Sequence, residues 1–106
     1  MLRIIEINPS EIPIQRTYTI GNVDYTFAFT YNARFDFISV SISLDGEIVF
    51  STKLTYGINM LFGNHTIPFA VVPMAEVDLY KEGFESLKVN KETLGSKVFL
   101  YFEDGQ

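Results

Sequence analysis

Residues 23–31 alternate between large apolar or aromatic side chains at odd positions and small or polar ones at even positions. This period of two is typical of a β-strand with one face in a core. A second alternating run covers residues 17–20, and Gly21 and Asn22 between the two runs predict a two-residue hairpin turn. The predicted pairs are Ile20 with Val23 and Tyr18 with Tyr25.

The next strand has the opposite parity. Apolar residues occupy the even positions of residues 38–44, and serines occupy the odd positions between them. We therefore predict a four-residue loop over residues 32–35, which keeps the apolar faces of both strands together. The predicted pairs are Phe29 with Ile38, Phe27 with Val40 and Tyr25 with Ile42.

A turn around Asp45 and Gly46 leads to a fourth strand. A two-residue turn would place the apolar side chains of its two strands on opposite faces. We therefore predict a three-residue loop, Leu44–Gly46, with Gly46 left-handed in a bulge. The predicted pairs are Ile42 with Ile48, Val40 with Phe50 and Ile38 with Thr52, which complete a four-stranded meander with one apolar face.

Two apolar segments follow the meander. Residues 56–63 are bounded by glycines at positions 57 and 63 and are apolar at both helical and strand spacing, which predicts a covered loop or a short helical turn. Residues 67–74 contain Pro68 and Pro73, which cannot donate hydrogen bonds to a neighbouring strand. An edge strand is expected there.

The remaining segments complete the predicted fold. Residues 1–13 predict an N-terminal strand and loop, and residues 77–97 a polar excursion that includes one helical turn, capped by Asn90 and ended by Gly95. Residues 98–102 are apolar at every position, as in a strand covered on both faces. We predict one all-β domain over residues 1–106, a small antiparallel barrel or sandwich built on the N-terminal four-stranded meander.

The composition supports a packed domain and narrows the function classes. Hydrophobic residues make up 47% of the 106 residues and aromatic ones 15%, enough to form a core. The net charge is −5 and the Lys and Arg residues are scattered, so direct nucleic-acid binding is not expected. The absence of Cys excludes disulfides and thiolate metal sites. Neither a membrane span nor a signal peptide is expected.

Few residues have the spacing of a catalytic or metal site. His65 is the single histidine and is interpreted as a surface loop residue. Glu76 and Asp78 alternate at an expected strand end and are followed by Glu82 and Glu85, but this segment lacks the ligand loop of a calcium site. A solvated acidic face is the preferred interpretation. We expect no catalytic residue, no metal site and no cofactor.

Four stretches in a shared order carry a resemblance to a known family. They are TYTIGNVDYTFAFTYNARFDF, which contains Tyr31, Asn32 and Arg34; SISLDGEIVFSTKL, with Asp45 and Gly46; YGINML, with Gly57 and Leu61; and LGSKVFLYF. In this order the stretches, from Tyr18 to Phe102, resemble the cyanophage baseplate plug family, a group of small proteins from the baseplates of contractile phage tails.

The resemblance implies a structural virion protein without catalytic residues. It would join or plug the hub and tail-tube region of a contractile phage or of a tail-like bacteriocin. Its partners would be other baseplate, hub or tail-tube proteins in a multi-copy assembly, and its location the virion or tail-like particle, assembled in the bacterial host cytoplasm.

The final strand is the candidate for docking on a partner. An apolar strand of this kind is able to join a neighbour's sheet, although a central core strand explains the same pattern. The candidate docking residues are Val98, Phe99, Leu100, Tyr101 and Phe102.

Two other function classes stay open. The first is a non-enzymatic β-barrel binding module for carbohydrate or a small ligand, with Tyr56 and Tyr80 as exposed aromatic residues. The second is an enzyme, which would rest only on His65 and the acidic segment. The aromatic series of residues 25–31 also suits base or sugar stacking, but its pairing with residues 38–44 makes core packing the better account.

Overall fold

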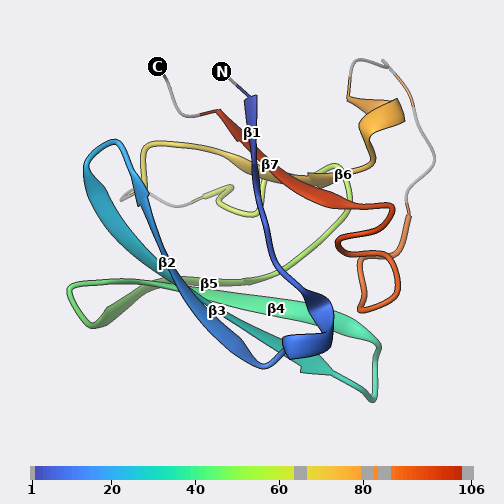
Figure 1. The fold of residues 1–106 in the computed structure, drawn as a ribbon, viewed down its shortest axis with the longest axis horizontal. Coiled ribbons are helices and arrows are strands. Elements are labelled where there is room, and N and C mark those ends of the chain that lie inside the picture. Colours follow the sequence, from blue (N-terminus) through green and yellow to red (C-terminus); the bar gives the residue numbers. More distant parts are fainter. Residues whose placement is uncertain (1, 64–66, 80–82, 84–86, 104–106) are drawn as a thin grey trace.

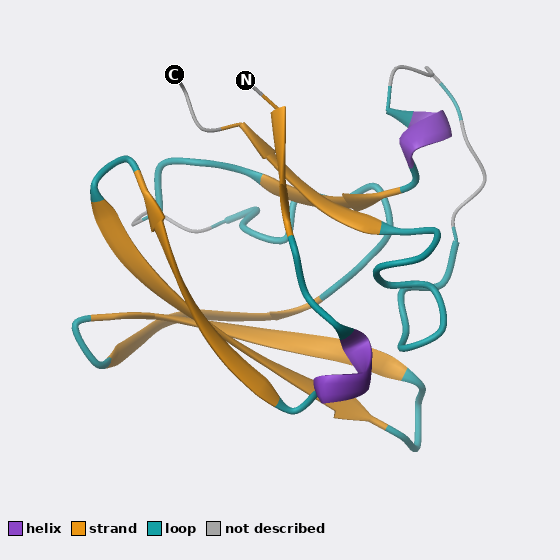
Figure 2. Cartoon of the chain, viewed as in Figure 1, coloured by secondary structure: helices purple, strands orange, loops and turns teal. Residues whose placement is uncertain are grey.

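The computed structural model describes residues 2–63, 67–79, 83 and 87–103 and contains two antiparallel β-sheets and no α-helix among them (Figures 1 and 2). The sheets have the strand orders β2-β3-β4-β5 and β1-β7-β6 and do not close on one another. The elements are β1 (Leu2–Ile5), η1 (Pro9–Glu11), β2 (Ile14–Ile20), β3 (Val23–Asn32), β4 (Phe37–Leu44), β5 (Glu47–Lys53), β6 (Val71–Met74), η2 (Glu76–Asp78) and β7 (Phe99–Glu103). The predicted all-β class is confirmed.

The two sheets lie as two layers around one cluster of buried hydrophobic side chains (Figure 1). Phe27 and Phe29 of β3 are fully buried, as is Leu100 of β7. Between the layers, the Phe69 ring contacts Tyr25 edge-on at 5.1 Å and Phe102 at 6.2 Å between centroids. The core position of the aromatic residues of β3 is therefore confirmed.

The β2–β3 hairpin has the predicted register. Ile20 lies opposite Val23 and Tyr18 opposite Tyr25. Gly21 and Asn22 both have positive φ, 61° and 66°, the left-handed geometry that a two-residue type I′ turn requires. Strand β2 begins at Ile14, three residues before the predicted start, because its pairing with β3 continues to Phe29.

The predicted register of β3 with β4 is wrong by two residues. Phe29 lies opposite Val40 and Phe27 opposite Ile42, because the four-residue loop covers residues 33–36 and Asn32 is already paired with Phe37. A slip of two residues leaves every side chain on the same face of the sheet. The apolar face is therefore as predicted although its partners differ.

The predicted three-residue loop between β4 and β5 is also wrong. Asp45 and Gly46 form a two-residue turn with φ of 51° and 83°. The parity conflict of such a turn is resolved inside β5, where the register shifts after Ile48 and brings Phe50 opposite Ile42. This β-bulge leaves Ile48 67% exposed, although the sequence predicted it in the core.

The segments outside the meander follow their predictions closely. Residues 56–63 form a loop that buries Tyr56, Met60 and Leu61, and β6 is an edge strand. The N-terminal strand β1 pairs with β7, which lies between β1 and β6. The loop before β2 contains η1 and a cis peptide bond between Ile12 and Pro13.

Candidate functional site

The five predicted docking residues lie in or next to the central strand of the three-stranded sheet. Val98 and Leu100 are fully buried, Tyr101 and Phe102 nearly so, and Phe99 is half-buried. Both backbone edges of β7 are paired, one with β1 and one with β6. Joining a neighbour's sheet requires an unpaired edge, which β7 lacks. Contact between these residues and a partner stays a prediction.

The outer edge of β6 is closed by the preceding loop. The Val71 N–H donates to Asn59 Oδ1 at 3.0 Å, and the Val71 carbonyl accepts from the Met60 N–H at 2.8 Å. The Pro73 carbonyl accepts from the Gly57 N–H at 2.8 Å, and proline has no N–H of its own to satisfy. A further strand therefore has no free backbone groups to pair with along these residues.

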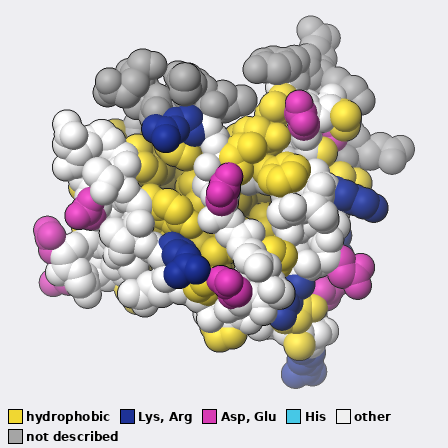
Figure 3. All heavy atoms as spheres, viewed as in Figure 1, with side chains coloured by type: hydrophobic (Ala, Val, Ile, Leu, Met, Phe, Trp, Pro, Cys, Tyr) yellow, Lys and Arg dark blue, Asp and Glu magenta, His cyan; other side chains and the backbone are white. Residues whose placement is uncertain are grey.

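The outer edge of β1 is different. Within the part of the chain that the structure describes, no strand pairs with its outer side. A hollow of about 270 Å³ adjoins it, lined by Ile4, Ile5, Glu6, Ile7, Leu94, Gly95 and Phe99. On the face that contains β1, hydrophobic side chains gather in a depression (Figure 3). This edge, with Ile4 42% exposed, is the open edge of the three-stranded sheet.

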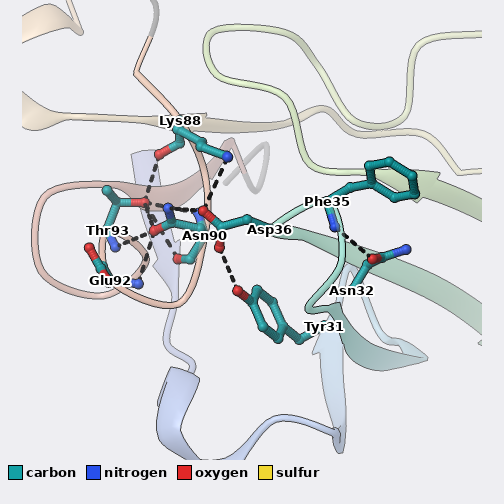
Figure 4. Close-up of polar contacts among 8 residues, drawn as sticks. All are labelled: Tyr31, Asn32, Phe35, Asp36, Lys88, Asn90, Glu92 and Thr93. Carbon is teal, nitrogen blue, oxygen red and sulfur yellow. Dashed lines mark hydrogen bonds and ion pairs between the residues drawn. The ribbon is translucent and has the colours of Figure 1, made fainter.

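A polar cluster fastens the β3–β4 loop to the segment before β7 (Figure 4). The Tyr31 hydroxyl donates to Asp36 Oδ1 at 2.5 Å, and Asn90 Nδ2 donates to Asp36 Oδ2 at 3.0 Å. Lys88 Nζ lies 3.1 Å from the same Oδ2. Asp36 has a positive φ of 56°, a conformation that aspartate tolerates better than most residues.

The pKa values of Asp36 and Tyr31 are shifted in opposite directions by the hydrogen bond that joins them. The hydrogen bond from Tyr31 lowers the pKa of Asp36, and the bond from Lys88 acts in the same sense. The same Tyr31–Asp36 bond raises the pKa of the Tyr31 hydroxyl. Both shifts favour the ionised carboxylate beside the neutral phenol, which is the state that the hydrogen bond needs.

The predicted turn at Asn90 is present and anchors the other half of the cluster. Asn90 Oδ1 accepts from the N–H groups of Glu92 at 2.9 Å and Thr93 at 3.0 Å, as a capping side chain does. The Leu94 N–H donates to the Asn90 carbonyl, and Gly95 follows with a φ of 85°. Asn90 thus caps its own turn with one end of its amide and holds Asp36 with the other.

Tyr31, Asn32 and Arg34, which belong to the first stretch of the family resemblance, lie in or beside this loop. Asn32 Oδ1 accepts from the Phe35 N–H at 3.0 Å, which closes the turn at the end of β3. The Arg34 guanidinium lies over the Phe35 ring, 5.3 Å from its centroid, and Phe35 itself is 63% exposed. Tyr31 and Asn32 therefore have structural roles, while Arg34 and Phe35 face outward.

A hollow lies beside this loop. Its volume is about 140 Å³, and it is lined by apolar side chains, among them Phe35, Phe37, Leu87 and Val89, and by Lys53 and Lys88. Lys53 Nζ lies over the Phe37 ring at 4.8 Å. Sequence reasoning missed this surface, because its residues come from three segments that are far apart in the chain. The only sequence signal for it is the dipeptide Arg34–Phe35, an aromatic residue beside a cation in a loop.

The predicted solvated acidic face is wrong for Asp78. Glu76 is exposed, but both residues lie in η2 rather than at a strand end, and Asp78 is buried. The Tyr56 hydroxyl donates to Asp78 Oδ2 and accepts from the Ala75 N–H at 3.0 Å. Burial raises the pKa of Tyr56, and the hydrogen bond to Asp78 adds to the effect.

The other candidate residues contribute no site to the described structure. Among residues 2–63, 67–79, 83 and 87–103, no group of three acidic or histidine side chains is placed to hold a metal ion. His65, Tyr80, Glu82 and Glu85 lie outside the described residues. In the same ranges, no helix has the length and hydropathy of a membrane span. Tyr56 is only 4% exposed, so it cannot stack on a ligand as the binding-module alternative requires.

Comparison with known families decides what kind of protein this is. A family model described as Cyanophage baseplate Pam3 plug gp18 matches residues 2–105. The chain belongs to this cyanophage baseplate plug family. No significant match was found among curated proteins or among solved structures.

Membership of the baseplate plug family indicates which kind of partner the surfaces of this chain contact. A baseplate plug is a structural, virion-associated component that associates with other baseplate components. The described structure has an edge strand at β1 and several exposed apolar side chains, Phe35 and Ile48 among them.

Proposed function

We propose that this chain is a structural virion protein of a contractile phage or tail-like bacteriocin, where it joins or plugs the hub and tail-tube region of the baseplate. The family match over residues 2–105 carries the proposal, because it spans both sheets and every described loop. The particle would be assembled in the bacterial host cytoplasm.

The partners proposed here are hub or tail-tube proteins, and the contact is centred on the sheet that contains β7. Val98–Phe102 supply the rigid middle of that sheet, while β1 supplies the edge on which a partner strand adds. An added strand would lie along β1 (Leu2–Ile5) and would place an apolar side chain near Ile7, Leu94 and Phe99.

Cross-linking of purified tail particles tests the proposal. Mass spectrometry of the cross-linked particles is expected to join this chain to hub or tube proteins. Cross-links only to proteins outside the tail would contradict the hub and tube assignment.

A matched pair of variants tests the β1 edge. Ile4→Lys places a charge on the open edge, a change that opposes strand addition, and should reduce incorporation into particles. Ile58→Lys changes a comparably exposed side chain in the loop after β5 and should not. Equal incorporation of both variants would show that docking does not use this edge.

A further inference from the structure

One end of the four-stranded sheet is acidic. The β2–β3 and β4–β5 turns lie at the same end of this sheet, opposite the β3–β4 loop (Figure 1). We call this surface the acidic end; its residues are Val23, Asp24, Asp45, Glu47 and Ile48, all of which are exposed. Among the described residues, no Lys or Arg forms an ion pair with its three carboxylates.

The opposite end is basic. It consists of the β3–β4 loop, the last residue of β5 and the segment that Asp36 holds in place. We call this surface the basic end; its residues are the exposed Arg34, Phe35, Lys53, Leu87 and Lys88 and the partly buried Lys91. Among the described residues, four cations here face two carboxylates, Asp36 and Glu92, which gives this part of the surface a positive balance in a chain whose net charge is −5.

Three of the four cations at the basic end form no ion pair with another described residue. Lys88 pairs with Asp36. In the part of the molecule that the structure describes, Arg34, Lys53 and Lys91 have no carboxylate within ion-pair distance and lie over aromatic rings instead. Their charges are therefore available to a partner.

Each end also presents a large apolar side chain. The bulge in β5 turns Ile48 outward at the acidic end, where it is 67% exposed between Glu47 and the rest of the strand. At the basic end Phe35 is 63% exposed and borders the hollow of about 140 Å³, whose rim includes Lys53 and Lys88. An aliphatic side chain beside carboxylates thus matches a hollow whose apolar side chains lie beside lysines, although Asp36 also lines it.

We propose that two copies of this chain bind head to tail, the acidic end of one copy on the basic end of the next, with Ile48 in the hollow beside Phe35. The opposite charges set the direction, because like ends repel. Two different surfaces make a heterologous contact, which repeats from copy to copy and forms a ring where the rotation closes. This inference rests on the two ends alone and does not depend on the proposed hub or tube partners.

Sedimentation velocity of the purified chain tests the inference. The wild-type chain is expected to associate with rising concentration, and association should weaken when NaCl is raised from about 50 mM to about 500 mM, where surface charges are screened. Arg34→Glu/Lys53→Glu reverses the charge of the basic end, and Asp45→Asn/Glu47→Lys removes the net negative charge of the acidic end. Each variant alone should have a dissociation constant raised by about tenfold or more.

Sedimentation of a mixture of the two variants tests whether the acidic end binds the basic end. The mixture should associate again, since one variant keeps the native acidic end and the other keeps the native basic end. Arg16→Glu, in the middle of β2, changes charge away from both ends and should associate like the wild type. Circular dichroism checks that each variant is folded.

Two results would overturn the inference. The first is a wild-type chain that stays monomeric at low salt, which would show that the two ends do not bind one another. The second is a pair of folded variants whose mixture does not associate.

Discussion

Asn90 donates a hydrogen bond from its side-chain amide to the carboxylate of Asp36, which lies 54 residues earlier in the chain, at 3.0 Å. This bond joins the loop of one sheet to the turn that precedes the central strand of the other. It also holds Lys88 and Phe35 on the same surface, because Asp36 is bonded to the first and adjacent to the second. The shape of the basic end therefore depends on a polar contact between distant segments.

Asn90→Ala should destabilise the chain by about 1–2 kcal/mol, because it removes a turn cap and a partly buried hydrogen bond together. Asn90→Ser keeps a capping oxygen but cannot reach Asp36 in the same way. It should therefore lose less stability than Asn90→Ala. Urea denaturation of both variants measures the difference. Equal stability of Asn90→Ala and the wild type would show that the junction does not hold the two segments.

The junction should also make stability depend on pH in the acidic range. The pKa of Asp36 is lower in the folded chain than its ordinary value of 3.8, so the unfolded chain binds more protons as pH falls. The stabilisation from Asp36 is present above that value and is lost as pH drops through the folded pKa. The stability difference between the wild type and Asp36→Asn should therefore shrink below about pH 4. A difference that stays constant down to pH 2 would contradict this role.

Tyr56→Phe should cost about 1–3 kcal/mol, since it removes the hydrogen bonds to the buried Asp78 carboxylate and from the Ala75 N–H. The pKa of Tyr56 is raised in the folded chain, so its contribution is fully present below pH 10 and is lost as pH rises through the folded pKa. Thermal melts from pH 8 to about pH 11 should show a shallower decline for Tyr56→Phe than for the wild type. A parallel decline would exclude Tyr56 as a source of alkaline sensitivity.

Gly46→Ala should cost about 1–2 kcal/mol, because a Cβ is strained at its φ of 83° although no atom lies within 4 Å of that Cβ. Gly83→Ala is the matched control, since Gly83 has equally open space and no positive φ. The free energy of unfolding of each variant, measured by chemical denaturation, separates the cost of backbone strain from any general cost of adding a methyl group. Comparable losses in the two variants would argue against the two-residue turn between β4 and β5.

Local sequence signals were sufficient to predict the strands of the meander and the register of its first hairpin, but not the registers of the other two hairpins. The β2–β3 register could be predicted because Gly21 and Asn22 both tolerate positive φ and fix a two-residue turn. The β3–β4 register could not, because a slip of two residues keeps Phe29 on the same face and leaves the hydrophobic pattern unchanged.

The bulge and the junction lay beyond sequence reasoning for different reasons. A bulge inside β5 and a longer loop at Gly46 both reconcile the parity of the two strands, and only packing distinguishes them. The Asp36–Asn90 contact joins two polar residues that are 54 positions apart, so no local sequence pattern predicts it. The surface around Phe35 and the exposure of Ile48 follow from these two features, which is why neither was predicted.

Quantitative mass spectrometry of purified tail particles tests the baseplate assignment most directly. The account predicts that this chain is present at a fixed ratio to the other baseplate proteins in every preparation and stays bound through particle purification. Particles that are complete in their baseplate proteins and contain none of this chain would contradict it.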